Sequence, residues 1–219
     1  ISKSTDRNSS STDRNSIMEN NNFVNNAKIK DIKESISKKI LQKKSSTIDD
    51  SKDAIKDRCL SAYLEAQEEL GFEIEPREIS AMILFFLNKE IMSYNEGVSK
   101  GGTRLRGYEF LPPDILAEII VRYEHIERIS MNGKKTSDDS TIIGVYVDDG
   151  EMVGTYDLDE SAINSTVKKY SSLENSKQVA EVRAKIFDLM KNRVSFLDSN
   201  PHKVAVQNGV FNWDTKELE

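Results

Sequence analysis

The sequence has few of the residues that build disulfide frameworks and zinc centres, with one cysteine and two histidines in 219 residues. A single thiol, Cys59, cannot form an intrachain disulfide, and it indicates a reducing compartment. Zinc sites of the usual kind need more cysteine and histidine ligands than this chain offers. A metal site formed by the carboxylate oxygens of aspartate or glutamate is not excluded by this composition.

Long apolar runs are also missing. The longest, Ala81–Leu87, is far too short to span a bilayer, and no signal peptide is visible at the N-terminus. We therefore expect an intracellular, cytoplasmic protein with no membrane partner. The formal net charge of −6 gives no overall electrostatic case for nucleic-acid binding, so any such case rests on local basic patches.

Apolar residues make up only 37% of the chain while charged residues make up 31%, which indicates that part of it does not fold. We expect residues 1–48 to form a polar, largely disordered tail, and the short sequence STDRNS occurs in it twice. Its stretch Ala27–Lys44 is rich in lysine and has isoleucines at helical spacing, at positions 29, 32, 36 and 40. This basic amphipathic stretch is interpreted either as a solvated, partly helical tail or as an arm that binds nucleic acid or a partner.

Residues 49–133 are predicted to form a small helical domain. The apolar spacing predicts helices over Asp53–Leu70, Glu75–Tyr94 and Leu111–Ile129, of which the second is apolar almost all round and is expected to be central and buried. His125 lies in the third predicted helix, where a surface or packed histidine is the ordinary interpretation. Cys59 lies within an apolar stripe and is expected to be a buried thiol.

Residues 134–219 are predicted to form a mixed unit, which makes the fold class α+β. The pattern favours a β-hairpin, two helices and a second β-hairpin, in that order. The ranges are Ile142–Val147 with Met152–Tyr156 for the first hairpin, Asp159–Ser172 and Asn175–Phe196 for the helices, and His202–Glu219 for the second hairpin. Asp159 is expected to cap the first helix, and the second hairpin to turn at Asn208–Gly209 and again near Asp214–Thr215.

The motif YVDD at Tyr146–Asp149 is similar to the Y-x-D-D signature of reverse transcriptases. Adjacent aspartates can hold a catalytic divalent cation, but a palm-type site also needs a carboxylate from an earlier strand. Upstream of Tyr146 we expect helices and no strand that carries an aspartate. Because Asp-Asp-Gly is also a common turn sequence, a structural turn is the alternative interpretation.

Other catalytic motifs are missing: the sequence has no G-x-x-x-x-G-K-[ST], no G-x-S-x-G and no H-E-x-x-H. We therefore expect no catalytic residue, no metal site and no cofactor in this chain, and no enzymatic activity from it alone.

Two local basic segments are candidates for contact with DNA. Lys100, Arg104 and Arg106 lie on a glycine-containing loop beside Tyr108 and Phe110, and basic side chains among aromatic ones suit a nucleic-acid backbone and a base to stack on. Lys134 and Lys135 follow Asn-Gly in a predicted turn. An ordinary solvated loop is the alternative for the first segment, since three charges are few.

From about residue 140 to residue 219 the sequence resembles the N-terminal domain of phage, plasmid and poxvirus primase-helicases, which precedes a superfamily 3 helicase ATPase. The resemblance lies in the segment from Gly144 to Tyr170, in the helix Asn175–Phe196, and in Asn208, Gly209, Val210 and Phe211, which are similar to that family's Asn-Gly hairpin. It implies that the protein continues past Glu219 into a larger domain.

The resemblance implies a non-catalytic region of a mobile-element DNA primase-helicase, acting in replication in a bacterial host cell. It would bind single-stranded or forked DNA or help the helicase motor assemble, with a homo-oligomer formed through the full-length protein. One alternative is a free-standing interaction module that binds a protein partner around Phe85 and Phe86. The other is a nucleotidyltransferase fragment that uses Asp148 and Asp149.

Overall fold

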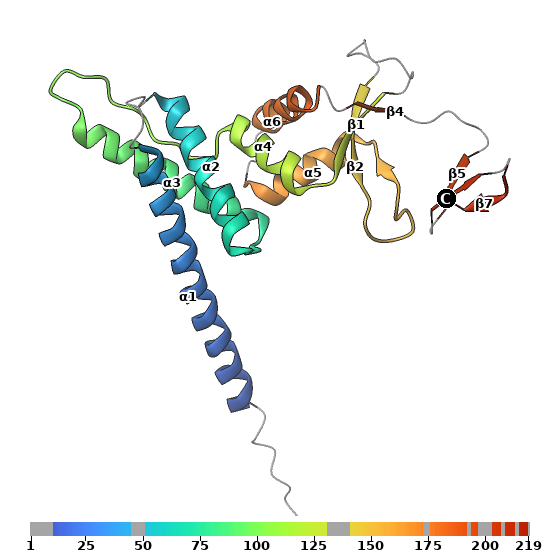
Figure 1. The fold of residues 1–219 in the computed structure, drawn as a ribbon, viewed down its shortest axis with the longest axis horizontal. Helices are drawn as coiled ribbons and strands as arrows, with labels where there is room; N and C mark the ends of the chain where they lie inside the picture. The colour runs from blue at the N-terminus through green and yellow to red at the C-terminus, as the bar shows by residue number, and fades with distance from the viewer. Residues whose placement is uncertain are drawn as a thin grey trace, which may run out of the picture. The chain divides into compact units, whose positions relative to one another are not determined.

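The structure, a computed structural model, divides into two compact units (Figure 1). The first comprises residues 1–73 and 90–105, and the second residues 74–89 and 106–219. The backbone is described for residues 11–44, 51–130, 141–172, 176–191, 194–196, 203–206, 209–212 and 215–218, and side chains for residues 28–44, 51–130, 141–172, 176–191 and 215–217. The predicted α+β class is confirmed, whereas the predicted domain limits stay predictions.

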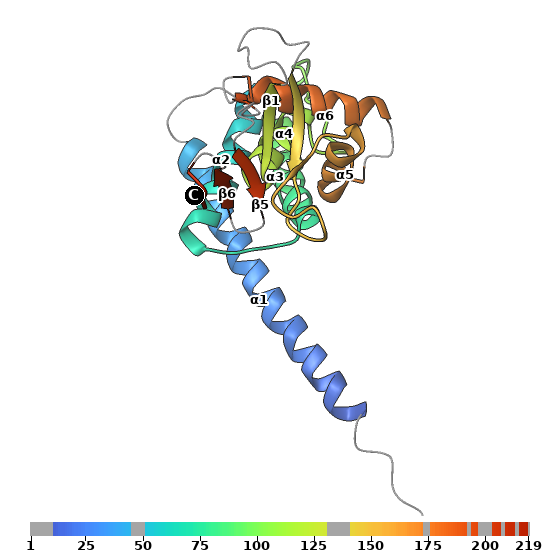
Figure 2. The same ribbon diagram turned by 90° about the vertical axis from the view of Figure 1, so that its right-hand side faces the viewer.

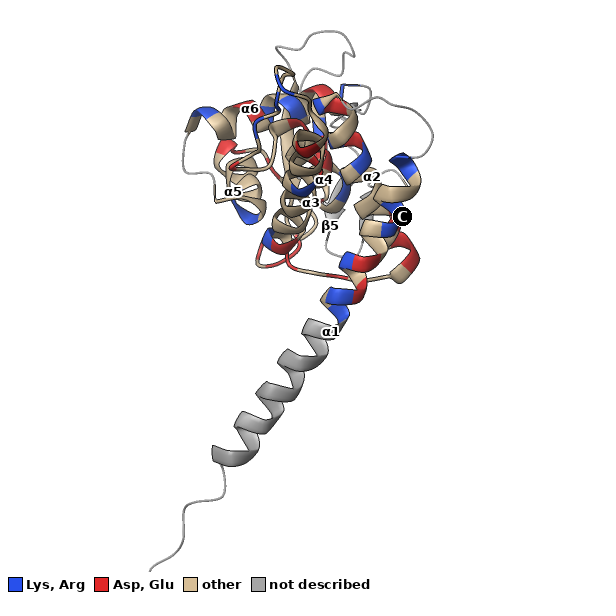
Figure 3. Ribbon diagram, turned by 90° about the vertical axis from the view of Figure 1, so that its left-hand side faces the viewer, with Lys and Arg blue, Asp and Glu red and all other residues tan. Residues whose placement is uncertain are grey.

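The first unit contains α1 (Ser11–Lys44) and α2 (Lys52–Leu70), which pack against each other. Ile32, Ile36 and Ile40 are buried, so the amphipathic helix that the isoleucine spacing predicts is present. Lysines recur along its described end, where Figure 3 colours them blue. Two of them pair with glutamates of α2, where Lys39 Nζ and Lys43 Nζ each lie 2.6 Å from a carboxylate oxygen.

Helix α2 has a well-formed cap at each end. The Ser51 hydroxyl accepts a hydrogen bond from the Ala54 amide at 3.1 Å, and Gly71 ends the helix in the left-handed conformation with φ 58°. The predicted apolar stripe is buried except at Leu70, which is 46% exposed. Leu70 is the last residue of the helix.

Helix α3 (Pro76–Gly97) crosses the boundary between the two units. The residues of its predicted core stripe are buried: Ile79, Met82, Ile83, Phe86, Leu87 and Ile91. The helix is not buried all round, however, because Phe85 is 50% exposed and Met92 is 60% exposed. Phe86 is buried, so the prediction that both Phe85 and Phe86 form an exposed apolar surface is wrong for Phe86.

The second unit is built around a four-stranded sheet. Its elements are α4 (Pro113–Tyr123), β1 (Ile126–Ser130), β2 (Thr141–Tyr146), β3 (Tyr156–Asp157), α5 (Glu160–Tyr170), α6 (Ser176–Leu189) and β4 (Val194–Phe196). The strand order is β3-β2-β1-β4, in which β1 pairs antiparallel with β2 and parallel with β4. Helices α4, α5 and α6 pack on one another along one face of the sheet (Figures 1 and 2).

Two predicted helices extend too far. Helix α4 ends at Tyr123, and Ile126 and Ile129, predicted to be helical, lie in β1 opposite Val145 and Ile142. Likewise, α6 ends at Leu189 and Val194 begins β4. β-Branched isoleucine and valine fit a pleated strand well, and the pairing of β1 with two neighbours overrides their helical spacing.

The first predicted hairpin is present with a shorter second strand. Met152 and Val153, predicted to pair, are exposed in a turn, and β3 contains only Tyr156 and Asp157. Asp159 caps α5 as predicted, since its carboxylate accepts a hydrogen bond from the Ser161 amide at 2.7 Å.

A second sheet, with order β5-β6-β7, follows at the C-terminal end of the chain. It contains β5 (Lys203–Val206), β6 (Gly209–Asn212) and β7 (Glu217–Leu218). Gly209 pairs with Val206 as the first residue of β6, so the turn predicted at Asn208–Gly209 is wrong for Gly209, and Asn208 lies outside the described residues. The later turn is confirmed at Thr215 and Lys216, where Lys216 has φ 58°.

We expect Gly144→Ala to lower the free energy of unfolding by about 1–3 kcal/mol, as for an overpacked core. A Cβ at this position in β2 would lie 2.7 Å from Ile129 Cδ1 and 3.1 Å from Tyr156 Cβ. Gly97→Ala is the control, because a Cβ at Gly97 would meet nothing within 4 Å. Urea denaturation of both variants measures the effect, and equal stability of the two would contradict it.

Candidate nucleic-acid interface

The basic loop, residues 98–106, carries three of the predicted DNA-binding side chains. Lys100, Arg104 and Arg106 are all exposed. Within the part of the chain that the structure describes, none of the three forms an ion pair with a carboxylate. Lys134 and Lys135, the other two predicted residues, lie outside the described residues. The loop therefore presents its cations to solvent without internal neutralisation by a described acid.

An asparagine of α3 anchors the loop in the first unit. The Asn95 side-chain amide donates to the Leu105 carbonyl at 2.8 Å and accepts from the Leu105 amide at 2.8 Å. A carboxamide offers one acceptor and a donor side by side, as a peptide group does, so one side chain satisfies both backbone groups of Leu105. Arg104 immediately precedes this anchor.

A second asparagine makes the same pair of bonds in the second unit. The Asn88 amide donates to the Tyr108 carbonyl at 2.9 Å and accepts from the Tyr108 amide at 2.8 Å. The approach is so close that a Cβ at Gly107 would lie 2.9 Å from Asn88 Oδ1. Arg106 lies between the two anchored residues in the sequence. The backbone on both sides of Arg106 is thus held by hydrogen bonds, which limits its freedom before any ligand binds.

A polar cavity of about 540 Å³ lies in the first unit, beside the start of the basic loop. Its charged lining residues are Lys44 of α1, Arg58 of α2 and Glu90 of α3. Lys44 Nζ lies 2.8 Å from Glu90 Oε2, and Arg58 Nη2 lies 3.6 Å from the same oxygen. Both cations therefore lie within ion-pair distance of the same carboxylate oxygen.

Burial makes this charge cluster energetically important. Arg58 and Glu90 are both buried, at 8% exposure each, and the removal of one partner from a buried ion pair typically costs about 3–5 kcal/mol. Lys44 is the more accessible cation, with a side chain that is 33% exposed.

Cys59 follows Arg58 on α2 and is buried as predicted. Burial raises the pKa of its thiol to about 12, and the charge of Glu90 also raises it, while Arg58 and Lys44 act in the opposite direction. The thiol therefore stays protonated at neutral pH, and a role as a nucleophile is disfavoured.

The acidic turn after β2 lies in the second unit. Asp148 and Asp149 are exposed, and a strand, β1, does precede them, contrary to the helix predicted there. That strand carries Glu127 and no aspartate. Among the described residues, no group of three His, Cys, Asp or Glu side chains is arranged to hold a metal ion.

An aromatic cluster lies beside the same turn and was not predicted. The His125 ring stacks on Tyr146 with ring centroids 4.4 Å apart, and His125 Nε2 lies 2.9 Å from the Tyr156 hydroxyl. Tyr146 and Tyr156 are paired in the register of β2 and β3, so a correct hairpin register would have revealed two of the three rings. The third ring, that of His125, was not foreseen because His125 was predicted to lie in a helix.

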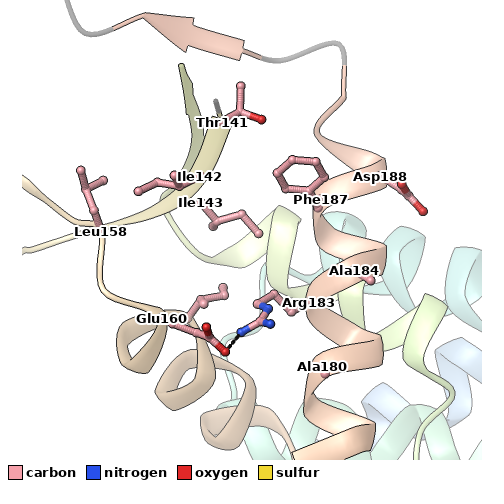
Figure 4. A pocket seen from close by; sticks show the side chains of 11 residues that line it. Thr141, Ile142, Ile143, Leu158, Glu160, Ala180, Arg183, Ala184, Phe187 and Asp188 are labelled. Atoms are coloured by element: carbon pink, nitrogen blue, oxygen red, sulfur yellow. Dashed lines mark hydrogen bonds and ion pairs between the residues drawn. The ribbon is translucent and has the colours of Figure 1, made fainter. Parts of the chain in front are cut away.

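A second cavity, of about 510 Å³, lies between β2, α5 and α6 (Figure 4). Its lining is largely apolar, with Ile143 and Phe187 on opposite sides, and an ion pair between Arg183 and Glu160 at one end. Arg128 lies over the Phe187 ring at 3.8 Å and donates to the Thr141 hydroxyl at 3.1 Å. This cavity lies within the second unit, and none of the predicted DNA-binding residues is among the residues that line it.

None of the helices in the described residues combines the length and the apolar character needed to cross a membrane.

The part of the chain from α4 onward is a mixed α+β region with two small sheets. The same part, residues 115–219, matches the family described as D5 N terminal like, the N-terminal domain of phage, plasmid and poxvirus D5-type primase-helicases. The resemblance is thereby confirmed, and its range starts at Ile115, earlier than the predicted start near residue 140. The match indicates a role in DNA replication as the N-terminal region of a D5-like primase-helicase. No curated protein matches the chain.

We expect Asn95→Leu to release the Leu105 backbone, because the variant can neither donate nor accept a hydrogen bond. Loss of both bonds should speed hydrogen exchange at the Leu105 amide by about tenfold or more. Exchange measured by nuclear magnetic resonance gives the rate for each amide. The Tyr108 amide, bonded to Asn88, is the internal control, and an equal acceleration at both amides would argue against two separate anchors.

The raised pKa of Cys59 predicts a pH-dependent stability. The unfolded thiol ionises near pH 8.5 while the folded thiol stays protonated, so stability is fully present below about pH 8.5 and is lost as pH rises toward about 12. Wild type should lose up to about 1.4 kcal/mol per pH unit above pH 8.5 relative to its value at pH 7. Cys59→Ala should lack this component in urea denaturation at pH 7 and 9.5, and parallel pH profiles would refute the assignment.

Proposed function

We propose that this chain is a non-catalytic, DNA-binding N-terminal region of a phage or plasmid primase-helicase, and that it binds single-stranded or forked DNA through the basic loop. The observation that carries the proposal is the loop itself, with three exposed cations on a backbone anchored to α3 by asparagine side chains. The family match to residues 115–219 supports the setting in replication.

The chemistry of the loop favours phosphate over base recognition. Lysine and arginine side chains bind phosphate oxygens without regard to sequence, and Arg104 and Arg106 can each do so with two N–H groups. Phe110, which is 37% exposed, and Tyr108 follow them in the sequence and offer aromatic surface, which suits bases of a single strand. Because the backbone is anchored beforehand, less conformational entropy is lost on binding.

The proposed role needs no cofactor and no catalytic group in this chain. Priming and unwinding would belong to other parts of the full-length protein, and the homo-oligomer would form through that protein. In a bacterial host cell, the region would hold DNA near the motor or help the motor assemble on it.

The double variant Arg104→Gln/Arg106→Gln tests the proposal. Loss of two phosphate contacts should weaken binding of a fluorescent single-stranded oligonucleotide and reduce the magnitude of the salt slope, d log K/d log [salt], by about 1.4. Both the affinity and the salt slope can be measured by fluorescence anisotropy. A salt range of about 50–200 mM is suitable, because binding through phosphate contacts weakens strongly over this range.

The matched control is Arg122→Gln/Lys185→Gln, which removes the same charge from exposed positions on α4 and α6. It should leave the salt slope unchanged. Equal effects of the two double variants would mean that overall charge, and not the loop, determines binding.

A protein-interaction module is the second candidate, favoured by the half-exposed ring of Phe85 on α3. Exposed apolar side chains of this size are common in partner interfaces. If wild type shows no salt-sensitive DNA binding, this candidate replaces the first, and Phe85→Asp should then abolish binding to a protein partner that co-purifies with wild type.

A further inference from the structure

We propose that the outer edge of β2 and the apolar cavity beside it form a docking site for an extended segment of a partner protein, which carries a large apolar residue and a basic residue. The segment would add a strand to the sheet at Ile143 and place its apolar side chain in the cavity. None of the residues that line this cavity belongs to the basic loop. The inference is therefore independent of DNA binding by that loop.

One side of β2 is only partly paired. Strand β1 pairs with β2 from Thr141 to Val145, whereas β3 pairs with it only at Val145 and Tyr146. Ile143 lies two residues before the last position that β3 reaches. Among the strands that the structure describes, none pairs with Ile143 on the side opposite β1.

The backbone groups of Ile143 face this open side. The Tyr146 amide donates to the His125 carbonyl, on the side of β1, at 2.9 Å. The next amide, that of Val147, donates to the Thr155 carbonyl, on the side of β3, also at 2.9 Å. Successive residues of a strand direct their N–H and C=O groups to opposite sides, so Ile143, four residues before Val147, faces the side of β3.

The chain after β3 leaves this edge because its backbone is bonded elsewhere. If β3 continued past Asp157 in the same register, Asp159 would lie opposite Ile143. The Asp159 amide instead donates to the Asp157 carboxylate at 2.9 Å. The Asp159 carbonyl accepts from the Ala162 amide at 3.0 Å, in the first turn of α5. Both backbone groups of Asp159 are thus used within its own segment, and β3 ends before it reaches Ile143.

Strand β2 also lacks the residues that usually protect a sheet edge. Its sequence, TIIGVY, contains no proline and no charged residue, and these are the residues by which edge strands avoid pairing with other chains. An apolar edge of this kind suits the addition of an extended segment, whose backbone hydrogen bonds to the edge supply affinity.

The cavity beside this edge, of about 510 Å³, offers room for a side chain of the segment. Ile143 points toward it from β2, and Ala184 and Phe187 face it from α6 (Figure 4). Ala184 is exposed and Phe187 is half-buried, so a ligand can reach this wall of the cavity. A leucine or phenylalanine side chain of the partner would exchange water for these apolar neighbours.

The charges of the cavity favour a basic residue in the segment. Its charged lining residues are Glu160, Arg183 and Asp188, which are two carboxylates and one guanidinium. Arg183 pairs with Glu160, while Asp188 lies farther along α6, beyond Phe187 (Figure 4). Asp188 is exposed and forms no ion pair with any residue that the structure describes. A lysine or arginine of the partner would complement this carboxylate.

The test uses a set of short fluorescent peptides, in which a central leucine, phenylalanine or methionine is flanked by valines and a lysine occupies each other position in turn. Binding to the full chain is measured by fluorescence anisotropy. Ala184→Leu enlarges a side chain on the cavity wall and should weaken the best peptide about tenfold or more, because the apolar residue of the peptide can no longer be buried. The matched control is Ala81→Leu, at an exposed position of α3 outside the cavity lining, and it should change binding less than about twofold.

A second arm tests strand addition with the wild-type chain, so it does not depend on the folding of a variant. N-methylation of each peptide amide in turn should weaken binding about threefold or more at alternate positions only, because only every second amide faces β2. In hydrogen exchange measured by nuclear magnetic resonance, the best peptide should slow exchange at the Ile143 amide. It should leave the Gly144 amide, which faces β1, unchanged.

The outcomes separate this site from the proposed function. No binding by any peptide of the set, or equal binding to wild type and Ala184→Leu, overturns the site. Equal effects of N-methylation at every position overturn strand addition. Protection of the Ile143 amide at high protein concentration without peptide means that a second copy covers the edge, and it overturns the partner segment. None of these results depends on the affinity of the basic loop for DNA.

Discussion

Glu90 is a carboxylate on α3 that folding takes out of water, and the first unit depends on its neutralisation. A buried, unpaired carboxylate would cost several kcal/mol, so the helices must bring cations to it. Lys44 at the end of α1 and Arg58 in α2 meet that need, at 2.8 Å and 3.6 Å from the same oxygen. One acidic side chain therefore joins three consecutive helices, α1, α2 and α3.

The same three helices fix where the basic loop begins. The loop leaves α3 after Gly97, and Asn95 ties it back to the helix at Leu105. The backbone N–H and C=O groups of an extended segment usually pair with a neighbouring strand. Here the side-chain amide of Asn95 takes the place of that strand for Leu105. The loop is thus irregular in conformation yet held at defined points, which is the combination that a contact surface for a flexible strand requires.

Features that depend on local spacing could be predicted from the sequence. The isoleucines of α1, the core stripe of α3 and the Asp159 cap of α5 were all predicted in this way, because helix periodicity and capping act within a few residues. Strands β1 and β4 were missed, because Ile126, Ile129 and Val194 also fit a helical period and their pairing partners are distant in sequence. Lys100, Arg104 and Arg106 were recognisable as a basic loop. The cavity was not, because its charged residues Lys44, Arg58 and Glu90 come from three different helices.

The position of β4 in the sheet has a consequence for how the chain emerges from the ribosome. Until Val194–Phe196 has been synthesised, β1 has a partner on only one side and its other edge exposes unpaired N–H and C=O groups. More than sixty residues separate the paired positions Arg128 and Val194, so this contact is slow to form and closes late. In a nascent chain, β1 would be an open sheet edge throughout that interval, and α6 is synthesised before the strand that closes this edge.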